Sequence, residues 1–66
     1  MDKETWKNEV SRILHEFETD KYRISYMTTY LVKDMENKYG RYSNLDVWPN
    51  PRIVVERFYK YKDNLT

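Results

Sequence analysis

The sequence has no cysteine, one histidine and one glycine among its 66 residues. Without cysteine the chain forms no disulfide bond, and His15 alone cannot supply the Cys and His ligands of a zinc site. A glycine-rich phosphate-binding loop is also excluded, because Gly40 is the single glycine. We therefore expect neither a metal ion nor a cofactor.

Long apolar runs are also missing. No stretch approaches the roughly 18 to 20 apolar residues of a membrane span. The first ten residues, MDKETWKNEV, are charged and unlike a signal peptide. These observations predict a cytoplasmic protein with no membrane partner. Alanine and glutamine are absent while Lys, Asn and Tyr are frequent, a composition typical of an AT-rich genome such as that of a low-GC bacterium or its phage.

Charged and aromatic side chains dominate what is present. Aromatic residues make up 17% of the chain, which favours a folded domain because disordered chains are poor in them. A single domain over residues 1–66 buries only about 60% of its unfolded surface, so a partner chain would add useful stability. Residues 1–20 hold six acids against three bases, and residues 21–66 hold nine bases against five acids. This asymmetry is typical either of an ordinary surface or of a nucleic-acid or self-complementary face.

Apolar spacing predicts an all-α fold of three helices. The first helix is expected over residues 3–18, with Asp2 as its cap and one apolar stripe. The second is expected over 21–39, begins after Asp20 or Ser25 and ends at Gly40. The stripe of the first helix comprises Trp6, Val10, Ile13, Leu14 and Phe17. The core face of the second comprises Ile24, Thr28, Leu31, Val32, Met35 and Tyr39, with Met27 on its flank.

A third helix is expected over residues 51–63, with Asn50 as cap and Pro51 in the first helical position. Its predicted core face comprises Val54, Phe58, Tyr61 and Leu65, whereas Arg52, Glu56, Tyr59 and Lys60 are expected to point away. The connection over 41–50 is apolar enough for Leu45, Val47 and Trp48 to pack against the helices. An α+β fold with short strands near 22–30 or 52–61 is the alternative, because Tyr, Ile and Thr favour sheets.

A row of tyrosines is the most distinctive feature of the predicted second helix. Tyr22, Tyr26 and Tyr30 recur every four residues and lie, with Lys33, opposite its core face. Tyrosine is common at interfaces because it buries a large ring and keeps a polar tip. The row predicts a non-enzymatic interaction module that binds another protein or a second copy of itself, such as a phage or mobile-element regulator. The competing interpretation is that another part of the same chain covers this side.

Nucleic-acid binding is the alternative function. The second half interleaves bases with aromatic rings, an arrangement suited to phosphate contact and base stacking. The candidate residues are Arg52, Arg57, Tyr59, Lys60 and Lys62. Against this alternative, the sequence pI of about 7.9 lies below the value above 9 common in DNA-binding domains.

Catalysis has little support in the sequence. His15 is the one candidate base, and it falls on the charged side of the first helix. We therefore expect no enzymatic activity.

Overall fold

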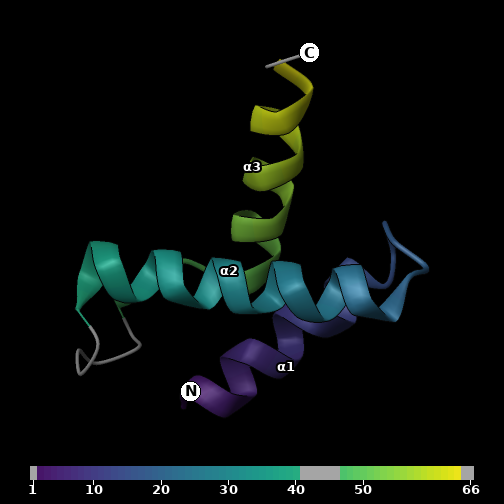
Figure 1. Cartoon of the computed structure of the whole chain (residues 1–66). Helices are drawn as coiled ribbons and strands as arrows, with labels where there is room; N and C mark the ends of the chain where they lie inside the picture. The colour runs from purple at the N-terminus through teal and green to yellow at the C-terminus, as the bar shows by residue number, and fades with distance from the viewer. Residues whose placement is uncertain (1, 41–46, 65–66) are drawn as a thin grey trace.

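A computed structural model describes residues 2–40 and 47–64, the last three of them by their backbone alone. The protein is all-α, with α1 at Lys3–Leu14, α2 at Lys21–Tyr39 and α3 at Pro51–Asn64. α1 packs against both other helices, and α3 runs away from α2 so that its C-terminal turns project from the body (Figure 1). The predicted three-helix fold is confirmed. The alternative strands near 22–30 and 52–61 are wrong, because both stretches are helical.

All three helices begin at a capping side chain. The side-chain oxygens of Asp2, Asp20 and Asn50 each accept a hydrogen bond from a first-turn backbone N–H, at 2.8 to 2.9 Å. Such caps satisfy backbone donors that have no partner within the helix. Asp20, not Ser25, therefore begins α2, and Pro51 opens α3 as its fixed φ favours.

α1 ends at Leu14, earlier than the predicted residue 18. The backbone N–H groups of Glu16 and Phe17 donate to carbonyls three residues back, on Ile13 and Leu14, at 2.9 and 3.0 Å. Bonds of this spacing tighten the last turn and stop the regular helix. Phe17 is therefore turned away from the apolar stripe of α1 and is 46% exposed.

Gly40 ends α2 as predicted. Its φ of 95° lies where a side chain would clash, and its N–H donates to the Glu36 carbonyl at 2.8 Å. A residue with a Cβ atom would raise the free energy of this turn, so the single glycine has a defined structural role.

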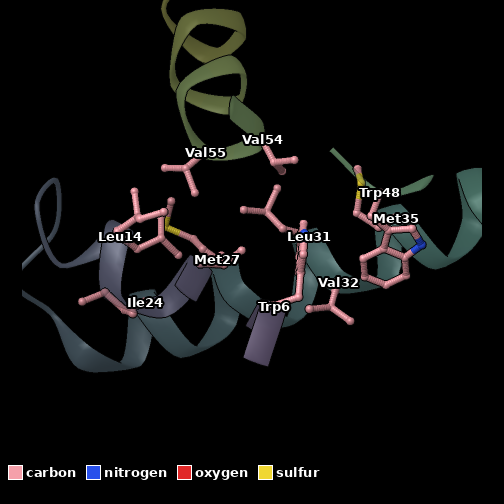
Figure 2. Packing of buried hydrophobic residues seen from close by; sticks show 12 residues of the cluster. Trp6, Leu14, Ile24, Met27, Leu31, Val32, Met35, Trp48, Val54 and Val55 are labelled. Atoms are coloured by element: carbon pink, nitrogen blue, oxygen red, sulfur yellow. The ribbon is translucent and has the colours of Figure 1, made fainter. Parts of the chain in front are cut away.

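The core gathers around Trp6. The Trp6 ring meets Trp48 edge to face at a centroid distance of 5.0 Å, and its Nε1 donates to the Pro49 carbonyl at 3.0 Å. Figure 2 shows Val54 and Val55 pointing from α3 into the same cluster. The buried apolar residues are Trp6, Val10, Ile13, Leu14, Ile24, Met27, Leu31, Val32, Met35, Trp48, Val54 and Val55. Most of the predicted core is present.

Several predicted core positions are nevertheless exposed. Val47 is 55% exposed, Tyr39 is 40% exposed and Tyr61 is 67% exposed. The projection of α3 explains Tyr61, because its outer turns leave the other helices (Figure 1). Leu45 and Leu65 lie outside the described residues.

Tyr59 is the opposite case, a residue predicted on the surface that is partly buried. It was expected to point away from the core, but its ring stacks on Phe17 with centroids 4.7 Å apart. The contact forms because α3 starts against α1, so the side of α3 that carries Tyr59 faces the turn after α1.

Candidate protein-interaction surface

The predicted tyrosine row faces outward. Tyr22 is 83% exposed, Tyr26 is 75% exposed and Tyr30 is 54% exposed. The opposite side of α2 supplies the core, which leaves these three rings on the protein surface. The interpretation that the rest of the described chain covers the row is therefore wrong for Tyr22 and Tyr26.

α3 extends this row into a larger surface. The Phe58 ring lies 6.2 Å from that of Tyr30, centroid to centroid, and Tyr61 follows one turn further along α3. We call Tyr22, Tyr26, Tyr30, Phe58 and Tyr61 the aromatic corner, because the five side chains lie where α3 leaves α2. The sequence predicted Phe58 and Tyr61 in the core. Phe58 is half-buried and packs against the core, whereas Tyr61 is exposed, because apolar spacing does not show how far a helix projects.

A hollow lies on each side of Phe58. The first is a cleft of about 360 Å³ between α3 and the C-terminal half of α2. Its walls include Tyr30, Tyr39 and Tyr61, together with the charged side chains of Asp34 and Arg57. The cleft has the volume and the mixed apolar and charged lining that suit a few anchoring side chains of a partner.

The second hollow lies toward the start of α2. It has a volume of about 380 Å³ and is lined by Tyr22, Arg23, Tyr26, Met27 and Phe58. The two hollows therefore share Phe58 as a common wall. Together they make the aromatic corner concave on both sides of α3.

Lys33 does not join the aromatic corner. It is exposed and lines a different hollow, beside Lys3 and Lys7 at the start of α1. The structure thus groups three of the four predicted protein-contact residues with α3 and leaves Lys33 at the border with α1.

The predicted nucleic-acid residues are dispersed. Arg52 donates two hydrogen bonds to the Glu16 carboxylate, at 2.8 and 3.4 Å, and Tyr59 packs on Phe17. Arg57 and Lys60 are exposed, while the Lys62 side chain lies outside the described residues. Two of the five candidates are therefore engaged in holding α3 against the end of α1.

The Tyr59 hydroxyl is buried without a hydrogen-bond partner in the described part of the chain. Burial raises the pKa of Tyr59, and the negative charge of Glu18 raises it further. A hydroxyl in this setting stays protonated at neutral pH. Tyr59 is thus a packing residue of the α1–α3 contact.

The Glu16–Arg52 pair predicts acid sensitivity. The hydrogen bonds that Arg52 donates to the Glu16 carboxylate lower the pKa of Glu16 below its ordinary value of 4.5. A carboxyl whose pKa is lower in the folded state stabilises the fold above its unfolded pKa, and this contribution is lost as pH falls through the folded pKa. We expect the thermal midpoint to fall as pH decreases below 4.5.

Glu16→Gln should reduce the fall of the thermal midpoint with decreasing pH. Circular dichroism melts at a series of pH values measure this dependence. Arg52→Gln is the matched variant, because it removes the other half of the same pair. The thermal midpoint of the double variant should depend on pH as much as that of either single variant. Single variants whose effects simply add would show that the two residues act independently.

Elsewhere in the described residues, the candidate catalytic and metal-binding side chains do not come together in one site. His15 is exposed and shares a hollow with Ser11 and Ser25, and the hydrogen bond described among the three is the backbone one from the His15 N–H to the Ser11 carbonyl at 3.2 Å. Residues 2–40 and 47–64 include no group of three or more acidic, His or Cys side chains placed to hold a metal ion. None of the described helices is long and apolar enough to cross a membrane.

In comparisons with known proteins, no family model, no curated protein sequence and no solved structure matches this chain. Its candidate function is therefore argued from the aromatic corner itself.

Proposed function

We propose that the protein is a small helical interaction module that binds another protein through the aromatic corner and catalyses no reaction. The observation that carries this proposal is the exposure of three tyrosines on α2 beside the projecting α3. Tyrosines and phenylalanine at a concave surface supply large contact area at low entropic cost. A cytoplasmic location and an origin in a phage or other mobile element stay predictions from composition alone.

Nucleic acid is a weaker candidate than protein for this surface. Among the described side chains of the predicted set, Arg57 and Lys60 are exposed cations with no carboxylate partner, and Arg52 is paired with Glu16. Phosphate binding grows with the number of free cations that contact the backbone. Two cations beside a set of exposed tyrosines favour a protein partner.

Site-specific photo-cross-linking in cells tests the proposal. A benzoylphenylalanine in place of Tyr26 keeps an aromatic side chain and should form covalent adducts with a protein. The matched control carries the same group at Asn8, which is exposed on the charged side of α1. We expect adducts from position 26 and none from position 8.

Two results would contradict the proposed function. One is an equal yield of protein adducts from both positions, which would indicate random collisions. The other is an adduct at position 26 that contains nucleic acid and no protein. An adduct with any protein, including a second copy of the chain, supports it.

A further inference from the structure

The cleft between α3 and the C-terminal half of α2 has an apolar floor. Leu31 and Met35 of α2 and Val54 of α3 line it, and all three belong to the buried core (Figure 2). An apolar side chain that enters the cleft therefore contacts the core and leaves water. The volume of about 360 Å³ is near the small end of the range for binding pockets, so it suits one or two anchoring side chains of a partner.

The charges around this floor do not balance. The described residues that line the cleft include two cations, Lys38 and Arg57, and one carboxylate, Asp34. Asp34 is already paired with Lys38 at 3.2 Å, whereas Arg57 is exposed and has no carboxylate partner among the described residues. The uncompensated charge in the wall of the cleft is therefore the guanidinium of Arg57.

The neighbouring hollow beyond Phe58 supplies no carboxylate from its described lining. Its charged residue is Arg23, whose guanidinium lies 3.7 Å from the Glu18 carboxylate. Two copies that met through the aromatic corner would thus bring Arg57 to a surface whose one lining carboxylate is already paired. Unpaired charges of like sign across an interface are unfavourable. The charges of the aromatic corner therefore favour an acidic partner over a second copy.

Arg57 lies one helical turn from the apolar floor. Val54 and Arg57 are three residues apart on α3, and Cβ atoms at this spacing are about 5 to 6 Å apart. A partner that fills the floor and also reaches Arg57 must present its apolar and acidic side chains equally close together. These two side chains are therefore expected within about four residues of each other in the partner sequence.

The groups in the cleft wall suit a carboxylate ligand. The planar guanidinium of Arg57 donates two parallel hydrogen bonds when it meets a carboxylate. Tyr30, Tyr39 and Tyr61 are exposed and line the same cleft, and each hydroxyl group is a further donor.

We propose that the cleft binds an acidic segment of a partner protein. An apolar side chain of this segment contacts Leu31, Met35 and Val54, and a neighbouring Asp or Glu carboxylate binds Arg57. This inference rests on the proposed function and specifies the chemistry of the partner. The tyrosines of the aromatic corner provide contact area, while Arg57 selects the partner by charge.

Peptide display on the purified full chain tests this inference. The probe is a library of random peptides of about 12 residues, long enough for about three helical turns. We expect the selected peptides to be enriched in Asp or Glu within about four residues of a large apolar side chain. Arg57→Glu should reverse this preference, so that Lys or Arg takes the place of the acidic residue.

Fluorescence anisotropy with one selected acidic peptide measures the contribution of Arg57. Arg57→Glu should raise the dissociation constant at least about tenfold, because a hydrogen-bonded ion pair becomes a repulsive contact. Replacing the acidic residue of the peptide with Lys should restore binding to this variant. Lys7→Glu is the matched control, because it makes the same change in net charge on α1, outside both hollows, and should leave the dissociation constant unchanged. Circular dichroism should show the same helicity for both variants, since both side chains are exposed.

Several results would overturn the acidic segment. A selection that enriches no peptide, or peptides without an acidic preference, is one of them. Another is an acidic preference that Arg57→Glu leaves unchanged, because the carboxylate would then bind elsewhere. Displacement of the peptide by self-association of the chain would assign the cleft to a second copy, and tighter binding of a single-stranded oligonucleotide than of any selected peptide would assign it to nucleic acid. Protein adducts from position 26 in cells, together with any of these results, would overturn this inference alone and leave the proposed function intact.

Discussion

Trp6→Ala is expected to leave the protein largely unfolded at room temperature. The Trp6 ring is 1% exposed, meets Trp48 edge to face and donates a hydrogen bond to the Pro49 carbonyl. Replacing a buried Trp by Ala costs about 3 to 5 kcal/mol. A domain of this size has a total stability of about 3 to 10 kcal/mol, so the substitution removes much or all of it.

Urea denaturation followed by circular dichroism measures this loss, and Tyr22→Ala is the matched control. Tyr22 also loses an aromatic ring but is 83% exposed, so its free energy of unfolding should change by at most about 0.5 kcal/mol. Trp6→Phe keeps most of the buried ring and leaves the Pro49 carbonyl without its donor, so it should fall between the two. Equal urea midpoints for Trp6→Ala and Tyr22→Ala would contradict the large contribution of Trp6 to the free energy of unfolding.

Local signals were enough to predict most of the helical structure. Asp2, Asp20 and Asn50 are residue types that cap helices, and each precedes an apolar repeat. Gly40 likewise predicted the end of α2, because a positive φ favours glycine. These features depend on a few neighbouring residues, which is why the sequence alone reveals them.

The arrangement of α3 depended on distant contacts and was harder to predict. A pattern of apolar residues gives the face of a helix that is buried, but not how far along its length burial continues. Tyr61 was therefore predicted in the core and Tyr59 on the surface, both wrongly, whereas Phe58 packs against the core but is only half-buried. The positions of all three follow from the way α3 meets α1 and then departs from α2.

The tyrosine row was predicted on its correct side of α2 for a simpler reason. The core face of α2 extends from Ile24 to Met35, about three turns, and is apolar except for Thr28, so the opposite side is defined without knowledge of the neighbouring helices. The concave shape of the surface could not be predicted in the same way. Its two hollows exist because Phe58 stands on a separate helix whose position depends on the α1–α3 contact.

The rotation of α3 about its own axis is the second feature with a large expected effect. Val55 is completely buried, whereas Ile53, two residues earlier, is 45% exposed. Two residues apart on a helix, these side chains point to different sides. Val55 contributes to the core between α1 and α2, although the apolar spacing of α3 did not single it out (Figure 2).

Val55→Asp is therefore expected to unfold the protein at neutral pH, while Ile53→Asp leaves it folded. A carboxylate at position 55 would lose its water without gaining a partner, at a cost of several kcal/mol. That cost is comparable with the whole stability of about 3 to 10 kcal/mol. At position 53 the same charge stays hydrated and lies in the first turn of α3, where the helix dipole favours it. Circular dichroism melts of the two variants compare one substitution on two sides of one helix. Similar melting temperatures would show that α3 is rotated differently from the arrangement described, and the outward position of Tyr61 would then be wrong as well.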